Sequence, residues 1–104
     1  MTWIQLDNRL HPADLGFLPE ILLSEDKRPV REQLADRYAH GGGYNPFKGF
    51  RLDRMTMTLH YPGDPPFRPG AMTQIGDEKV FFYPQGAWLL ILQPNGDWEV
   101  TRVD

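Results

Sequence analysis

The feature that most constrains the fold is an apolar run at residues 88–92 (WLLIL), which lies between two turns of one pattern. Residues 83–88 (YPQGAW) are followed ten positions later by 93–98 (QPNGDW), with proline second and glycine fourth in each. Proline presets φ for the first central position of a turn, and glycine accepts the positive φ that forms a bulge. Residues 79–103 therefore predict three consecutive antiparallel strands, with 88–92 at the centre.

These turns also predict the strand register. A bulged connection pairs Tyr83 with Ala87 in the first hairpin and Gln93 with Asp97 in the second. Side chains alternate between the two faces of a sheet, so this pairing assigns each residue to one face. The predicted core face carries Val80, Phe82, Trp88, Leu90, Leu92, Trp98 and Val100. The predicted opposite face, which is mixed in character, carries Lys79, Phe81, Tyr83, Leu89, Ile91, Glu99 and Thr101.

One main helix is predicted over residues 29–40 (PVREQLADRYAH). Proline is well tolerated at the first helical position, because its missing N–H would be unpaired there in any case. Val30, Leu34 and Tyr38 repeat every four residues and so share one helical face. Gly41 is a natural residue for the C-terminal end of the helix.

The predicted fold class is α+β, in a single domain that spans residues 1–104. An irregular segment (1–28) precedes the helix, and an antiparallel meander (50–103) carries it on one face. The expected strands are about 50–61, 71–75, 79–83, 87–93 and 98–103. The first strand changes its apolar phase midway, which predicts a bulge near Asp53 and Arg54. Bulges also favour coiling of the sheet, so a partly open barrel is an alternative fold. At the turn around residues 76–77, loops of two and of three residues both fit the sequence.

Composition and charge exclude several classes of function. The absence of cysteine excludes disulfides, thiolate metal sites and cysteine nucleophiles, and it suits a reducing cytoplasm. A net charge of −3 provides no global field that would attract nucleic acid or an anionic membrane. Neither a signal peptide nor an apolar run long enough to cross a bilayer is recognisable, so we expect a cytoplasmic protein without membrane contact.

Catalytic and metal-binding patterns are also missing from the sequence. The three histidines, at positions 11, 40 and 60, are scattered and match no metal motif. Asp36 and His40 lie one helical turn apart, but a histidine at a helix C-terminus is already favoured there by the helix dipole. We therefore expect no enzymatic activity, no cofactor and no metal site.

The first hypothesis for function is a non-catalytic protein-interaction module. A helix of about three turns covers only part of one sheet face. An apolar patch on the other face is then left for a partner protein, or for a second copy in a homodimer. The last strand, 98–103, offers an edge to the same contact. The expected contact residues are Phe81, Leu89, Ile91 and Val103.

The alternative hypothesis is a small nucleic-acid-binding domain. Residues 44–54 interleave aromatic rings with cations, a composition that stacks bases and holds phosphates. The candidate residues are Tyr44, Phe47, Lys48, Arg51 and Arg54. Asp53 interrupts this patch and the whole chain is negative, so nucleic acid ranks second to a protein partner.

The segment 38–50 (YAHGGGYNPFKGF), the proline-rich loop 62–70 (PGDPPFRPG) and the small size resemble uncharacterised proteins encoded by bacteriophages and prophages. The resemblance covers residues 29–62 and the C-terminal strands, and it brings no catalytic or binding motif. It implies a genomic setting and an accessory role in the host cytoplasm. That role would be a virion or assembly component, or a small protein that binds a host factor.

Overall fold

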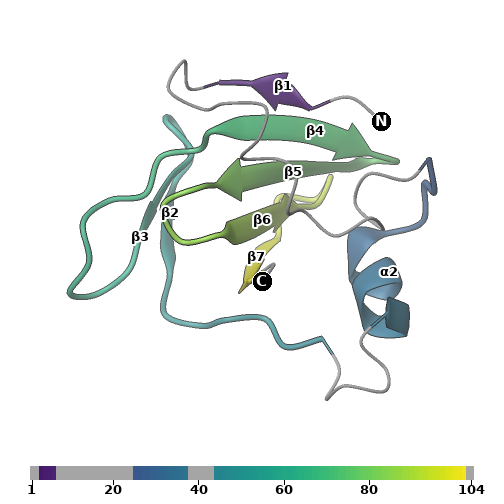
Figure 1. Ribbon diagram of the computed structural model, residues 1–104, viewed down its shortest axis with the longest axis horizontal. Coiled ribbons are helices and arrows are strands. Elements are labelled where there is room, and N and C mark those ends of the chain that lie inside the picture. The colour runs from purple at the N-terminus through teal and green to yellow at the C-terminus, as the bar shows by residue number, and fades with distance from the viewer. Residues whose placement is uncertain (1–2, 7–24, 38–43, 103–104) are drawn as a thin grey trace.

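A computed structural model describes residues 3–6, 25–37 and 44–102, and these residues form one helix and seven strands (Figure 1). The helix is α2 (Val30–Arg37). It confirms most of the predicted helix, whose last three residues lie outside the described residues. The strands are β1 (Ile4–Gln5), β2 (Arg51–Asp53), β3 (Thr58–His60), β4 (Ala71–Ile75), β5 (Glu78–Tyr83), β6 (Trp88–Leu92) and β7 (Trp98–Arg102).

Five of the strands form one antiparallel sheet in the order β1-β4-β5-β6-β7, and β2 and β3 pair separately. Strands β4 to β7 follow one another as the predicted meander. The α+β prediction is confirmed. The barrel alternative is wrong, because the large sheet ends at β1 and β7 and does not close on itself.

The predicted long strand over 50–61 is a hairpin instead. Leu52 of β2 lies opposite Leu59 of β3, so the chain reverses where a bulge was expected. The Asp53 carboxylate accepts a hydrogen bond from the Met55 N–H at 3.0 Å, and Met57 adopts a positive φ of 56°. These local bonds close a turn between the two halves. The change of apolar phase in the sequence therefore marks a reversal of the chain.

The first hairpin of the meander has a longer loop than predicted. Tyr83 pairs with Trp88 instead of Ala87, and Ala87 rather than Gly86 has a positive φ, of 53°. A slip of one residue moves every side chain of β6 to the other face relative to β5. The face toward α2 therefore carries Val80, Phe82, Leu89 and Ile91.

The other turns of the meander agree with the sequence. Gly96 has the predicted positive φ, of 94°, and the second hairpin has the predicted register. Ile75 pairs with Glu78, which settles the open question in favour of a two-residue loop. In that loop Gly76 has a φ of 60°, and a Cβ there would lie 2.6 Å from the Lys27 carbonyl oxygen, so glycine is required.

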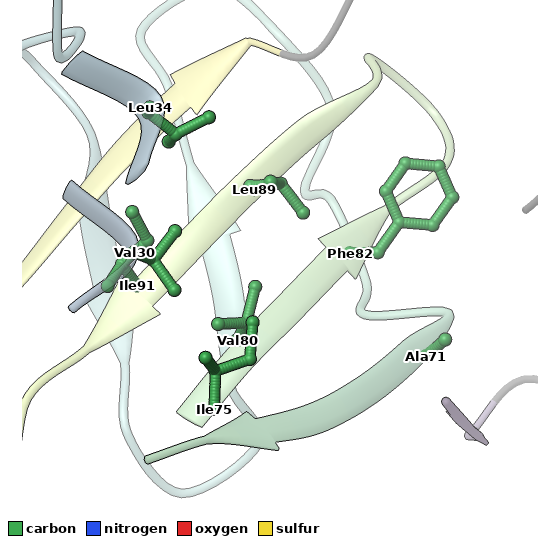
Figure 2. Close-up of a cluster of buried hydrophobic side chains, with 8 residues drawn as sticks. All are labelled: Val30, Leu34, Ala71, Ile75, Val80, Phe82, Leu89 and Ile91. Carbon is green, nitrogen blue, oxygen red and sulfur yellow. The ribbon is translucent and has the colours of Figure 1, made fainter. Parts of the chain in front are cut away.

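The sheet is covered on both faces, by α2 on one side and by the β2–β3 pair on the other (Figure 1). Val30 and Leu34 of α2 pack on the β4–β6 face, as Figure 2 shows. The buried members of this first cluster are Val30, Leu34, Ala71, Ile75, Val80, Phe82, Leu89 and Ile91. The buried members of the cluster on the other face are Phe50, Leu59, Phe81, Tyr83, Leu90 and Val100. Both faces of β6 therefore lie in the interior.

A buried carboxylate attaches the start of α2 to the sheet. Glu78, at the beginning of β5, is only 6% exposed. Its Oε1 accepts a hydrogen bond from the Val30 N–H at 2.6 Å. The first N–H groups of a helix have no partner within the helix, and the helix dipole favours a negative charge beside them. Gln33 fixes the segment before the helix, because its Nε2 donates to the Arg28 carbonyl at 2.7 Å.

We expect Glu78→Ala to lower the free energy of unfolding by about 2 kcal/mol, because it leaves the buried Val30 N–H without an acceptor. Glu78→Gln should lose less, since the amide oxygen can still accept. Urea denaturation followed by circular dichroism measures both. Glu25→Ala, which removes an exposed carboxylate, is the control. Equal midpoints for Glu78→Ala and Glu25→Ala would contradict the proposed attachment.

Candidate functional site

The apolar patch expected to bind a partner lies inside the chain. Leu89 and Ile91 are 0% exposed and Phe81 is 7% exposed. The register of the β5–β6 hairpin places Phe81 on the face opposite to Leu89 and Ile91, and each face has its own cover. These three residues are thus not available for docking, and Val103 lies outside the described residues.

The predicted edge, β7, is partly occupied as well. The Phe47 N–H donates to the Val100 carbonyl at 2.7 Å, in an antiparallel bridge. The segment that leads to β2 therefore runs along part of β7. The expected homodimer was based on this edge and on the buried patch, and it stays a prediction.

The five nucleic-acid candidates do not form one strip. The Phe47 ring packs against Trp88 at the start of β6, with ring centroids 5.0 Å apart. Arg54 lies beyond the other end of β6, where its Nη2 donates to the Gly96 carbonyl at 2.7 Å. Tyr44 lies near Glu99 on the side of the sheet that faces α2. Lys48 and Arg51 are exposed.

The structure instead gathers an aromatic surface, which consists of Phe47, Tyr61, Trp88 and Arg102. Phe50 lies beneath it and contacts both Trp88 and Tyr61, at centroid distances of 5.0 and 4.7 Å. The Arg102 guanidinium lies 5.1 Å from the Trp88 ring centroid, a favourable cation–π geometry. Phe47 and Tyr61 are 45% and 38% exposed. Two exposed rings are therefore held in place by packing on their inner sides.

Local geometry places each member of the aromatic surface. Trp88 and Arg102 are directly opposite in the β6–β7 pair. Tyr61 follows β3 and begins a turn in which Gly63 has a φ of 87° and the Asp64 N–H donates to the Tyr61 carbonyl at 3.1 Å. Gly86 leaves room for the Trp88 indole, because a Cβ there would overlap Nε1.

Sequence reasoning found only Phe47 of this surface. It placed Trp88 in the core, and it gave no functional weight to Tyr61 or Arg102. The available signal was the recurrent Pro-x-Gly-x-Trp turn, which puts a tryptophan at the first residue of a strand. That signal does not say which other segments meet the ring.

A second feature is a polar hollow of about 370 Å³ beside the β6–β7 turn. We call it the arginine hollow, and the side chains that line it are Arg31, Arg54, Gln93, Asp97, Trp98 and Glu99. The Arg31 Nε lies 3.1 Å from the Glu99 carboxylate, which joins α2 to β7. Sequence reasoning missed this hollow, because its residues come from three separate segments.

Comparisons with protein-family models, with curated proteins and with solved structures find no match for this chain. The described helix is too short and too polar to cross a membrane. Within residues 3–6, 25–37 and 44–102, no three His, Asp or Glu side chains gather closely enough to hold a metal ion. The aromatic surface and the arginine hollow are therefore the features of this chain that bear on its function.

Gly86→Ala should lower the free energy of unfolding by about 1–3 kcal/mol, because the added methyl group displaces an indole already held by Phe47, Phe50 and Arg102. Urea denaturation and near-ultraviolet circular dichroism measure the effect. Gln85→Ala, a change at the exposed neighbouring position, is the control. In a Trp88→Leu background the same glycine substitution should have a smaller effect, and an equal effect in both backgrounds would contradict this packing.

Tyr83, which is buried, and Tyr44, which is partly buried, differ in how their hydroxyl groups are satisfied. The Tyr83 hydroxyl donates to the Met57 carbonyl at 2.5 Å. The Tyr44 hydroxyl has no hydrogen-bond partner among the described residues. Burial raises the pKa of both side chains, and the negative charge of Glu99 raises the pKa of Tyr44 further.

We expect Tyr83→Phe to lower the free energy of unfolding at pH 7 by about 1–2 kcal/mol, and Tyr44→Phe to leave it unchanged or slightly higher. The pKa of Tyr44 is higher in the folded than in the unfolded chain, so its contribution is complete below about pH 10 and is lost as the pH rises beyond that value. Tyr44→Phe should therefore lose less stability than the wild type between about pH 10 and 12. Urea denaturation across that range measures this, and parallel curves would contradict it.

Proposed function

We propose that this chain is a non-catalytic protein-interaction module that contacts its partner through the aromatic surface. The observation that carries the proposal is the pair of exposed rings, Phe47 and Tyr61, held against Trp88 and Phe50. Tyrosine, tryptophan and arginine are the residues that most often dominate binding energy at interfaces. Side chains that are already ordered lose little conformational entropy when a partner binds.

The charge of the neighbouring segment supports a partner with an acidic surface. Four cations and two carboxylates occur between residues 44 and 70, in a chain whose net charge is −3. The cations are Lys48, Arg51, Arg54 and Arg68, of which Arg54 lies at the other end of β6, and the carboxylates are Asp53 and Asp64. Complementary charges around an interface raise the association rate and exclude partners of the wrong sign.

A protein partner is favoured over nucleic acid by the surroundings of Trp88. Phe47, Phe50 and Arg102 already contact its ring, so a base has little free ring face on which to stack. Two of the candidates for nucleic-acid binding, Phe47 and Arg54, also lie at opposite ends of β6. The resemblance to phage and prophage proteins supports, as part of the same proposal, an accessory role in the host cytoplasm.

A peptide-display selection tests the proposal. Random peptides are selected on the immobilised wild type, on Phe47→Ser/Tyr61→Ser and on Ile4→Ser/Leu6→Ser. The last variant is the control, because Ile4 and Leu6 are exposed apolar residues on or beside β1, at the opposite edge of the sheet. We expect acidic peptides with apolar anchors to be enriched on the wild type and the control. Their affinity, measured by fluorescence anisotropy, should fall about tenfold or more on the aromatic variant.

Equal binding to the aromatic variant and the control would overturn the proposal, as would the absence of any enriched sequence. A titration with single-stranded oligothymidylate at low and moderate salt separates the alternative. Salt-sensitive binding that is lost in Lys48→Ala/Arg51→Ala would favour the nucleic-acid hypothesis. The absence of binding at low salt would remove that hypothesis.

A further inference from the structure

The arginine hollow brings two guanidinium groups to one concave site. Arg31 comes from the first turn of α2, and Arg54 comes from the turn between β2 and β3. The β6–β7 turn and the start of β7 form the remaining wall. The site is therefore built by tertiary structure, on a different part of the molecule from the aromatic surface.

Arg31 is fixed on its inner side. Its Nε lies 3.1 Å from the Glu99 carboxylate. With the Gln93 amide oxygen turned toward it, Arg31 Nη2 and Nε lie 3.0 and 3.3 Å from that oxygen. A guanidinium carries five N–H donors. Within the described part of the chain the Nη1 group of Arg31 has no acceptor, so these donors remain available for a ligand.

Arg54 is held in a similar way and also retains donors. Its Nη2 donates to the Gly96 carbonyl at 2.7 Å. No acceptor for Nε or Nη1 is present among the described residues. Because both arginines are already oriented by fixed acceptors, a bound anion would not have to order two long side chains. Arginine donors in this planar arrangement match the oxygens of phosphate.

The carboxylates of the hollow are engaged by other groups of the protein. Glu99 pairs with Arg31, and Asp97 accepts a hydrogen bond from the Asn95 amide at 3.1 Å. They nevertheless balance the formal charge of the two arginines. Binding here must therefore come from direct hydrogen bonds to the unused guanidinium donors, and a phosphate offers three strong acceptor oxygens for them.

We infer that the arginine hollow binds a small phosphate-bearing molecule, with its phosphate between Arg31 and Arg54. Trp98 lines the same hollow and is partly buried. Its indole offers an apolar contact to the part of the ligand that carries the phosphate. The carboxylate of Asp97 opposes the phosphate and limits the affinity.

A ¹H–¹⁵N NMR titration with inorganic phosphate at pH 7.5 tests this inference, with chloride used to hold the ionic strength constant. We expect saturable shifts of the Trp98 indole N–H, assigned with Trp98→Phe, and of the Gly96 amide. Arg54→Gln should weaken binding about fivefold or more. Asp97→Asn should strengthen it by a similar factor, because it removes the opposing charge. Arg37→Gln, in the last turn of α2 and outside the hollow, is the control and should change nothing.

Shifts that increase linearly with phosphate concentration would overturn the inference, as would equal effects of Arg54→Gln and Arg37→Gln. Weaker binding by Asp97→Asn would also overturn it. Such results would indicate an adventitious ion only. Phe47→Ser/Tyr61→Ser should bind phosphate like the wild type, so this titration and the peptide selection can fail independently of each other.

Discussion

Strand β6 is apolar on both faces, and this property requires a cover on each side of the sheet. Leu89 and Ile91 face α2, whereas Leu90 faces the β2–β3 pair, and all three are 0% exposed. Burial of apolar surface is the main force that favours folding. A sheet built around such a strand is stable only as the middle of three layers. Phe81, Leu89 and Ile91, which were predicted to bind a partner, are therefore buried between the layers of this chain.

Two long-range hydrogen bonds attach α2 and the β2–β3 pair to the sheet, and both involve a side chain of β5. Glu78, its first residue, accepts from the Val30 N–H of α2, and Tyr83, its last residue, donates to the Met57 carbonyl in the β2–β3 turn. Pairing a buried polar group in this way avoids a penalty of about 1–3 kcal/mol. Burial of the two apolar clusters supplies most of the free energy that holds the layers together. These two hydrogen bonds fix the positions of α2 and of the β2–β3 pair on the sheet.

The two proposed binding sites follow from the way segment 44–54 passes the β7 edge. It brings Phe47 to Trp88 at one end of β6, and it continues into the turn that places Arg54 beside Gly96 at the other end. One end is aromatic and exposed, and the other is polar and concave. The two ends of β6 therefore present surfaces of different chemistry, and one proposal rests on each.

The sequence by itself determined the α+β class, the helix, the meander and the second hairpin, because apolar periodicity and glycine at positive φ are local properties. Tertiary structure decided the rest. A Pro-x-Gly turn accepts loops of more than one length, so packing on both faces of β6 selected the pairing of Tyr83 with Trp88. In residues 50–61 a β-bulge and a reversal of the chain both produce the observed change in the alternation of apolar residues. Long-range contacts selected the reversal, which forms the β2–β3 hairpin. Of the aromatic surface, only Phe47 could be predicted. The pairing of Trp88 with Arg102 follows from the predicted register of the second hairpin. Tyr61 reaches the surface only through Phe50, which joins it to Trp88 by contacts between segments distant in sequence.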